Sequence, residues 1–139
     1  MSQGGFTLQY VKRKARRGEL SFRESLVRTL RARLTKETAF FAMTGGGARM
    51  TGEVAALAGL GVMAGIPDLV LIHRGRAFGL ELKARSTSLS DQQRAAQVVL
   101  RDAGMRVEVA SDVGEALMHL RDMGIPLRGS GDFRRERAA

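Results

Sequence analysis

The sequence predicts a three-layer α/β/α domain with a small mixed sheet. Helical and strand-like segments alternate along the chain, as in sheets that are covered by helices. The 139 residues are enough for one domain with a buried core, and their composition, 44% hydrophobic and 27% charged, is typical of a soluble globular protein. A short hairpin in the middle of the chain supplies antiparallel strands for the sheet.

The first helix is expected to begin at Ser21. This serine is a good N-cap, and Glu24 follows three residues later, at the spacing of a capping box. Residues 1–20 are polar and end in a basic cluster, so we expect them to form a loosely ordered arm. Apolar residues then recur at helical spacing and are expected to face the core: Phe22, Leu26, Leu30 and Leu34.

The middle of the chain carries a strand, a loop, a helix and the hairpin. Residues 38–43 are mostly apolar and predict a short buried strand. The three glycines within residues 44–49 predict a flexible loop, and the Ala- and Leu-rich residues 52–63 predict a helix packed close to the sheet. Two apolar runs, 69–72 and 77–80, are separated by a turn and predict the antiparallel hairpin.

The last third of the chain predicts two helices around a strand. Ser90 is expected to cap a helix that ends at Ala103, before Gly104. Residues 105–110 alternate as a strand, and Ser111 is expected to cap a final helix. The predicted organisation is a basic arm over residues 1–20, a domain over residues 21–127 and a polar tail over residues 128–139.

The charge balance favours a nucleic-acid partner. Lys and Arg number 23 against 14 Asp and Glu, a net charge of +9, and such an excess favours a polyanion. The strongest basic run lacks the apolar anchors of a membrane-bound helix, and no run is long enough to span a membrane. The candidate DNA contacts are Lys12, Arg13, Lys14, Arg16, Arg17, Arg49 and Arg85.

Two further observations bear on where the protein works. The chain has no Cys, which excludes disulfides, thiolate metal sites and a Cys nucleophile and fits a reducing cytoplasm. The first residues do not form a basic segment followed by an apolar one, so we expect no signal peptide. We therefore expect a cytoplasmic protein that works with DNA.

A pair of carboxylates spans the hairpin. Asp68 begins one strand and Glu81 ends its antiparallel neighbour, so the two can lie side by side. Lys83 is two residues after Glu81 and projects from the same strand face, whereas Leu82 between them points into the core. Two carboxylates, with the backbone carbonyl of Leu82 as an extra ligand, suit Mg²⁺ or Mn²⁺, which support phosphodiester hydrolysis.

Each of these motifs has an ordinary structural explanation when taken alone. A Glu-x-Lys sequence can be an ion pair on an edge strand, and Pro67-Asp68 can be a simple strand start. Gln93 can be a solvent-facing helix residue. We interpret His73, in the hairpin turn, and His119, on the last helix, as structural or surface residues, because neither has ligand spacing to another His.

Taken together and in order, the motifs resemble the PD-(D/E)XK nuclease superfamily and, within it, the virus-type replication-repair nuclease (VRR-NUC) family. The resemblance extends over roughly residues 21–123 and rests chiefly on three segments: Gly65-Ile66-Pro67-Asp68-Leu69, Leu80-Glu81-Leu82-Lys83 and Leu89-Ser90-Asp91-Gln92-Gln93. An aromatic strand at residues 40–41, the glycine-rich loop and the approach to Pro67 over residues 61–65 also follow in the order of the family. It implies a restriction-endonuclease-like fold. It also implies that Asp68 and Glu81 bind the metal, that Lys83 is the catalytic lysine and that Gln93 is the active-site glutamine.

The resemblance also implies a third acid, on the first helix. Glu24 is the closest match, although it can equally be the capping partner of Ser21, and Arg28 stands where a glutamine is expected shortly after it. Glu19 and Glu53 are weaker candidates for this role. Thr44 replaces the Asn that many members carry in the loop before the second helix.

The activity implied by the resemblance is Mg²⁺- or Mn²⁺-dependent endonucleolytic cleavage of branched DNA, including four-way (Holliday) junctions. Stand-alone domains of this family act as homodimers, and fused members serve DNA repair. The alternative is a DNA-binding module on the same fold that no longer cuts. The intact set of Asp68, Glu81, Lys83 and Gln93 argues against that alternative.

Overall fold

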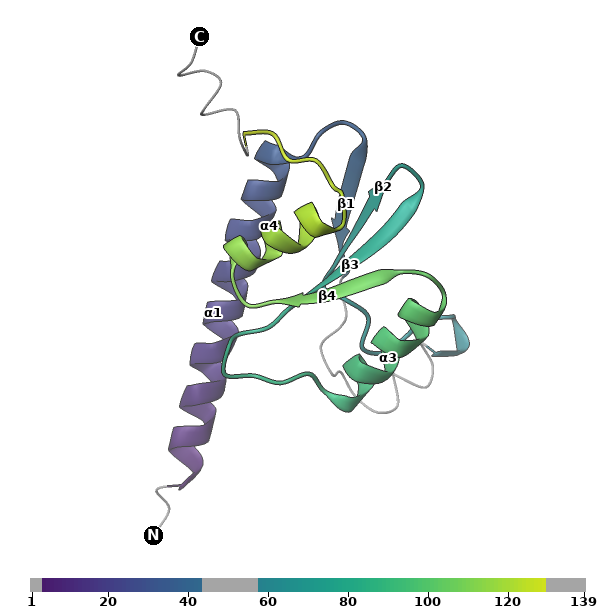
Figure 1. Ribbon diagram of the computed structural model, residues 1–139. Helices are drawn as coiled ribbons and strands as arrows, with labels where there is room; N and C mark the ends of the chain where they lie inside the picture. Colours follow the sequence, from purple (N-terminus) through teal and green to yellow (C-terminus); the bar gives the residue numbers. More distant parts are fainter. Residues whose placement is uncertain (1–3, 44–57, 130–139) are drawn as a thin grey trace.

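A four-stranded sheet of order β1-β2-β3-β4 lies at the centre of the domain (Figure 1). The computed structural model describes residues 4–43 and 58–129, and of residues 4–17 and 19 only the backbone. The strands are β1 (Thr38–Ala42), β2 (Leu69–His73), β3 (Arg76–Leu82) and β4 (Arg106–Ala110). The helices are α1 (Gly4–Arg33), α3 (Asp91–Asp102) and α4 (Val113–Asp122). The first three strands are antiparallel and β4 is parallel to β3, so the sheet is mixed.

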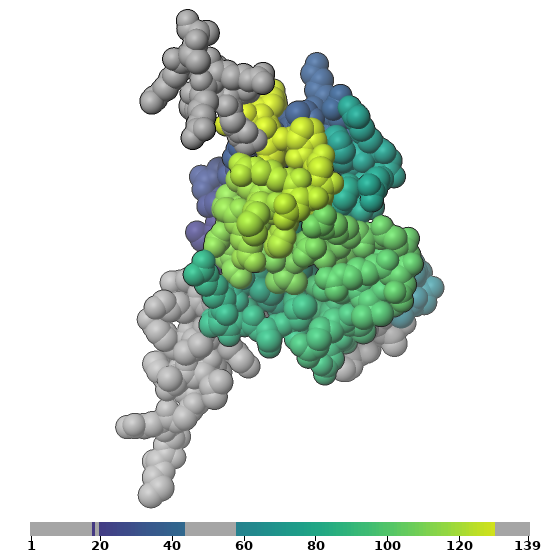
Figure 2. Space-filling view, viewed as in Figure 1, coloured from purple at the N-terminus to yellow at the C-terminus, as the bar shows by residue number. Residues whose placement is uncertain are grey.

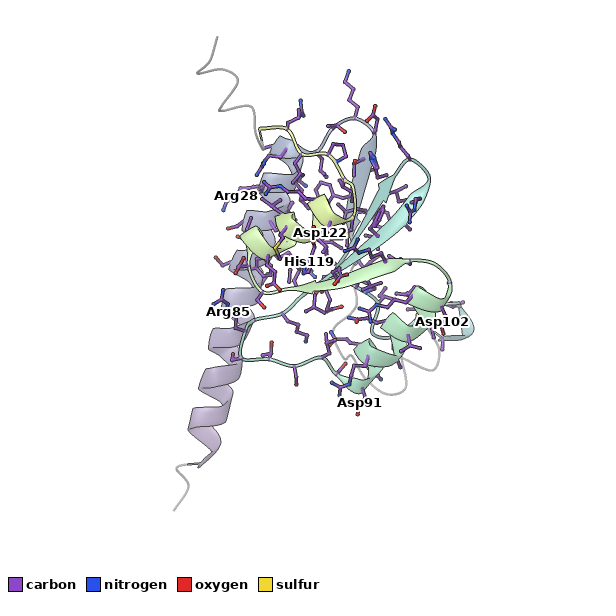
Figure 3. The ribbon with its side chains drawn as sticks, viewed as in Figure 1. Arg28, Arg85, Asp91, Asp102, His119 and Asp122 are labelled. Atoms are coloured by element: carbon purple, nitrogen blue, oxygen red, sulfur yellow. The ribbon has the colours of Figure 1, made fainter. Side chains whose placement is uncertain are left out.

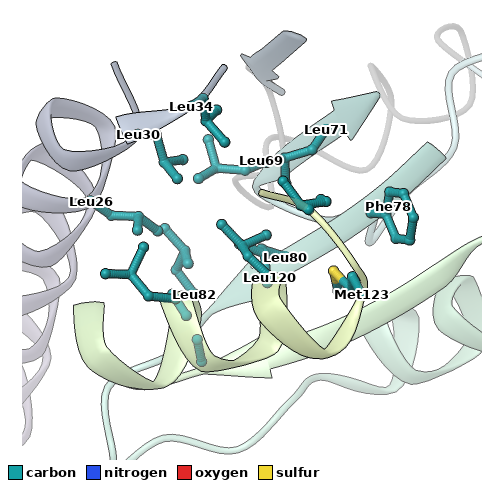
Figure 4. Packing of buried hydrophobic residues seen from close by; sticks show 14 residues of the cluster. Leu26, Leu30, Leu34, Leu69, Leu71, Phe78, Leu80, Leu82, Leu120 and Met123 are labelled. Carbon is teal, nitrogen blue, oxygen red and sulfur yellow. The ribbon is translucent and has the colours of Figure 1, made fainter. Parts of the chain in front are cut away.

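Helices α1 and α4 cover one face of the sheet. Their leucines form one core with alternate residues of β2 and β3, because successive side chains of a strand point to opposite faces (Figure 4). Helix α3 lies on the other face, where Val107 of β4 and Ala96 of α3 are buried outside this core. The predicted three-layer α/β/α fold with a small mixed sheet is confirmed. The residues of the core are Leu26, Leu30, Leu34, Leu69, Leu71, Phe78, Leu80, Leu82, Ala110, Ala116, Leu117, Leu120, Met123 and Ile125.

The hairpin of β2 and β3 closes through a two-residue turn. Arg74 and Gly75 both have positive φ, 48° and 79°, which is the requirement of the type I′ turn that matches strand twist. The register pairs His73 with Arg76 and Leu69 with Leu80. The predicted hairpin is therefore confirmed, and one step beyond its last pair the register sets Asp68 opposite Glu81.

N-cap residues explain where α3 and α4 begin. Ser90 caps α3 as predicted, and Gln93 completes a capping box with it. Helix α4 begins one residue later than predicted. Its N-cap is Asp112 rather than Ser111, because the Asp112 carboxylate accepts the backbone N–H of Glu115 at 2.8 Å. The backbone N–H of Ser111 instead donates to the Glu115 side chain at 2.9 Å.

The predicted start of the first helix at Ser21 is wrong. Helix α1 begins at Gly4 and runs without interruption to Arg33, and its N-terminal half extends beyond the sheet (Figure 1). No proline interrupts residues 4–33, and Gly18 alone costs only about 1 kcal/mol of helix stability relative to Ala. Ser21 and Glu24 therefore lie inside a helix and form no capping box. The division into residues 1–20, 21–127 and 128–139 stays a prediction.

The segment before the hairpin is only partly described. The predicted loop over residues 44–49 and residues 52–57 of the predicted helix lie outside the described residues. Ala58 and Gly59 are helical, but a turn follows at once and Gly61 has a φ of 87°. The predicted continuation of this helix to Met63 is therefore wrong. No helix in the described part of the chain has the length and hydrophobicity that a membrane crossing requires.

Candidate active site

Asp68 and Glu81 meet at the open end of the hairpin. Asp68 immediately precedes β2, and its backbone carbonyl accepts the N–H of Met43 at 2.9 Å, which ties it to the end of β1. Its Oδ2 accepts the backbone N–H of Leu82 at 2.8 Å. Glu81 is 2% exposed, on the sheet face that α3 covers. The strands thus hold one buried and one half-buried carboxylate next to each other.

Pro67 opens the strand pairing at this point. The N–H of Leu82 points toward the β2 side, and in an antiparallel pair the carbonyl of the same residue points to that side as well. The register would pair Leu82 with Pro67, which has no N–H to donate. The strand pairing therefore offers the Leu82 carbonyl no backbone N–H at this position. This agrees with the expected role of the carbonyl as a metal ligand.

Glu81 is in an unusual electrostatic position. Burial raises its pKa from 4.5 to about 9, and the negative charge of Asp68 adds to this effect, while Lys83 and Arg23 lower it. Its Oε2 is buried without a hydrogen-bond partner among the described residues. Such a pair of acids requires either a bound proton or a cation to be satisfied.

The donors present at the pair fit a hard divalent cation. Mg²⁺ and Mn²⁺ prefer carboxylate and carbonyl oxygens, and Mg²⁺ usually binds through one or two carboxylates while keeping several waters. Asp68, Glu81 and the Leu82 carbonyl supply that set. The fit rests on Glu81 Oε2, which no described group partners and which lies beside a second carboxylate.

Gln93 joins the pair from α3. Its Nε2 donates to Glu81 Oε1 at 2.9 Å, and its Oε1 accepts the N–H of Ser90 at 2.9 Å. The second bond fixes which end of the amide faces Glu81. Gly65, with a φ of 77°, lets the segment before Asp68 approach the first turn of α3 closely. A Cβ on Gly65 would lie 2.4 Å from the carbonyl oxygen of Gln92.

Lys83 follows β3 directly. Its backbone N–H donates to the Ala110 carbonyl at 2.9 Å, so β4 holds it in the extended conformation. By alternation its side chain shares the face of Glu81, whose pKa it lowers. Leu82 between them is buried in the core, as predicted.

Arg23 contacts Asp68, which is not among the contacts predicted from the sequence. The Arg23 guanidinium donates to Asp68 Oδ1, across 45 residues of sequence. The sequence does indicate that Arg23 faces the core, because it lies three residues before Leu26 and seven before Leu30 on the same side of the helix.

The structure does not bring Glu24 to the acid pair. Glu24 is exposed, and a helix turns about 100° from one residue to the next, so Glu24 is directed away from the side on which Arg23 meets Asp68. Among the side chains that the structure describes, no three His, Asp or Glu gather as a metal site. The role predicted for Glu24 as third acid therefore has no support in this geometry. The side chain of Glu19 and all of Glu53 and Thr44 lie outside the described residues.

The candidate DNA contacts are described only in part. The loop between β3 and α3 lies at the surface of the molecule (Figure 2), and its exposed Arg85 (Figure 3) pairs with Asp112 at 3.0 Å. Arg49 lies outside the described residues, as do the side chains of the basic run in α1, whose backbone is helical: Lys12, Arg13, Lys14, Arg16 and Arg17.

The two histidines have structural partners other than the acid pair. His73 Nδ1 lies 2.8 Å from Thr38 Oγ1 at the turn end of the hairpin. His119 lies on α4, where its Nε2 is 3.0 Å from the Val109 carbonyl oxygen (Figure 3). Both positions agree with the structural interpretation of these residues.

Comparison with known families agrees with this geometry. Residues 49–113 match the family model described as the VRR-NUC domain, a span that contains Asp68, Glu81, Lys83 and Gln93. Over these residues the chain is similar to VRR-NUC domains. A solved structure described as a VRR_NUC domain is similar to it at 18% sequence identity and a TM-score of 0.45, covering 78% of this chain and 95% of that one. No curated protein matches the sequence. VRR-NUC domains form a nuclease-type family, and the resemblance noted from the sequence is confirmed.

Proposed function

We propose that this protein is a Mg²⁺- or Mn²⁺-dependent endodeoxyribonuclease that cuts branched DNA. The observation that carries the proposal is the buried Oε2 of Glu81, which lies beside Asp68 and has no hydrogen-bond partner in the described part of the chain. Two acids in this position are costly when both are ionised, unless a bound cation offsets their charge. Lys83 and Gln93 at the same pair provide the remaining polar groups of a phosphodiesterase site.

Each residue has a distinct role in this proposal. Asp68, Glu81 and the Leu82 carbonyl would hold the cation, which supplies an activated water and neutralises charge on the phosphoryl oxygens. Lys83 donates to the phosphate or to the attacking water, and its charge favours the ionised form of Glu81. Gln93 orients the Glu81 carboxylate through its amide N–H.

The substrate class follows from charge and symmetry. A net charge of +9 favours a nucleic acid, and the basic run of α1 lies on the half of the helix that extends beyond the sheet (Figure 1). A four-way junction has two equivalent strands to cut, and a two-fold homodimer would present two equivalent sites to it. We therefore propose a homodimer as the active form.

The direct test is cleavage of a four-way junction in Mg²⁺ or Mn²⁺, compared with flaps, splayed arms and linear duplex. Asp68→Asn, Glu81→Gln and Lys83→Met should each reduce cleavage by at least about 100-fold while remaining folded. Asp102→Asn is the matched control, because this exposed acid lies at the far end of α3 (Figure 3). Wild-type cleavage by all three site variants would refute the proposal.

The absence of a third acid near the pair, among the described residues, favours one alternative, a DNA-binding module that does not cut. Calorimetric titration with Mn²⁺ separates the two. A nuclease should show a site that Asp68→Asn removes, whereas a non-cleaving module should bind the junction equally well with and without metal.

A further inference from the structure

Arg23 holds a defined position over the acid pair. Its guanidinium donates to Asp68 Oδ1, and the side chains of the two residues are 33% and 25% exposed. Leu26 and Leu30, on the same side of α1, are fully buried against the sheet. The packing of α1 therefore fixes the backbone of Arg23 beside Asp68, while the guanidinium itself remains in reach of solvent.

The two oxygens of Asp68 have different partners. Oδ2 accepts a backbone N–H, that of Leu82, which cannot leave without disturbing the end of β3. Oδ1 accepts a side-chain donor, that of Arg23, which can rotate away about its own bonds. Oδ1 is therefore the oxygen that Asp68 can offer to a cation.

A divalent cation and Arg23 compete for this oxygen. Both are positively charged, and like charges a few ångströms apart at a half-buried site repel each other. When a cation binds Asp68 and Glu81, the position of Arg23 on Oδ1 becomes unfavourable. The guanidinium then needs another anionic partner within reach.

The phosphate of a DNA strand is such a partner. A guanidinium presents five N–H donors in a planar fork, which matches two phosphate oxygens as well as it matches a carboxylate. Its one hydrogen bond in the described structure uses a single nitrogen, to Asp68. The remaining donors and the exposure of the side chain leave Arg23 able to take a phosphate at the mouth of the site.

We propose that Arg23 is a substrate-binding residue that exchanges between Asp68 and the DNA phosphate. Without metal, Arg23 neutralises Asp68. When metal binds, Arg23 is released to the phosphate, so that metal binding and DNA binding favour each other. This inference rests on the proposed nuclease function, since it requires both a cation and a DNA phosphate at this site.

The exchange predicts opposite effects of one substitution on two ligands. Arg23→Ala removes the competitor of the metal, so Mn²⁺ should bind the free protein at least about threefold more tightly in calorimetry. The same variant lacks the phosphate contact, so a four-way junction in Ca²⁺, which is used here to prevent cutting, should bind at least about fivefold more weakly. Arg23→Lys keeps the charge without the fork and should show both effects to a smaller degree.

Arg28→Ala is the matched control, because Arg28 is exposed on the same helix, five residues further on (Figure 3). It should leave Mn²⁺ affinity unchanged. If folded Arg23→Ala, or Arg23→Lys where the alanine variant does not fold, binds Mn²⁺ no more tightly than wild type, or binds the junction equally well, the exchange is refuted. Failure of the proposed function would appear differently, as a wild-type protein with no Asp68-dependent Mn²⁺ site and no cleavage.

Discussion

The side-chain amide of Gln93 connects the cap of α3 to the buried carboxylate of Glu81. Its oxygen accepts the N–H of Ser90, and its nitrogen donates to Glu81 Oε1, both at 2.9 Å. One residue thus has a structural role and a role in the site. Substitutions that remove one role at a time can separate them.

Gln93→Glu and Ser90→Ala form such a pair. Glu at position 93 still accepts in the capping box but presents an anion to Glu81, so we expect little loss of stability and at least about a tenfold loss of DNA cleavage. Ser90→Ala removes the cap oxygen and should lower the free energy of unfolding by about 1 kcal/mol, with cleavage largely retained. Thermal unfolding and junction cleavage measure the two effects. Equal losses of cleavage in both variants would contradict this separation.

The pKa of Glu81 predicts how stability depends on pH without metal. Because the pKa is about 9 in the folded protein and 4.5 for an ordinary Glu, the folded chain binds this proton more tightly than the unfolded chain. The stabilisation is fully present below pH 4.5 and is lost as pH rises toward 9, at up to about 1.4 kcal/mol per pH unit.

Glu81→Gln keeps the shape of the protonated acid but cannot ionise. In EDTA we expect this variant to be more stable than wild type at pH 8 and nearly equal to it at pH 4.5, as measured by urea unfolding. Asp102→Asn, an exposed acid on α3, should follow the wild-type curve. A wild-type protein whose unfolding free energy does not decrease relative to Glu81→Gln between pH 5 and 8 would show that Glu81 is not buried as described.

Pro67 is expected to keep the Leu82 carbonyl available. Pro67→Ala supplies an N–H opposite Leu82, at the position where the β2–β3 ladder now lacks a donor. The new hydrogen bond would occupy the carbonyl, so Mn²⁺ affinity should fall by about tenfold or more without unfolding of the domain. Calorimetry with Mn²⁺ measures this, and unchanged affinity would mean that the carbonyl is not a ligand.

The basic run of α1 is expected to determine the salt dependence of DNA binding. Each cation that contacts a phosphate contributes about 0.9 to the slope of log affinity against log salt. Replacing all five basic residues of this run by Gln should therefore reduce the slope by about 0.9 for each phosphate contact that is lost. The double variant Arg28→Gln with Arg121→Gln, at two exposed positions, should change the slope less. Binding of the junction at several salt concentrations tests this, and equal slopes would contradict it. The five are Lys12, Arg13, Lys14, Arg16 and Arg17.

The hairpin and α3 could be predicted from sequence because their signals are local. Alternation and an Arg74-Gly75 turn define the hairpin, and Ser90, Gln93 and Gly104 define the ends of α3. Since Asp68 and Glu81 are placed by that hairpin, their meeting followed from the same local signals. The capping signal at Ser21 was misleading, because a cap matters only where a helix has a reason to start.

Contacts between distant segments could not be predicted in this way. The pairing of Arg23 with Asp68 requires α1 to cross the sheet at one place, and this depends on how Leu26 and Leu30 pack in the core. A helix position fixed by packing also decides that Arg23, and not its neighbour Glu24, reaches the acid pair. Helical spacing indicates that Arg23 faces the core, but no short-range pattern contains which residue of the sheet it meets there.

Gly65 and Gly75 offer a matched test of the packing between the Asp68 segment and α3. Both have positive φ, 77° and 79°, so alanine at either position costs about 1–2 kcal/mol of backbone strain. At Gly75 a Cβ meets open space, whereas at Gly65 it would lie 2.4 Å from the carbonyl oxygen of Gln92 and 2.7 Å from the nitrogen of Gln93.

Gly65→Ala must therefore move the first turn of α3 and with it the side-chain amide of Gln93, which donates to Glu81. We expect it to unfold at lower urea concentration than Gly75→Ala and to cut the junction at least about tenfold more slowly, while Gly75→Ala cuts at the wild-type rate. Equal unfolding midpoints and equal rates for the two variants would show that the Asp68 segment and α3 are not in close contact.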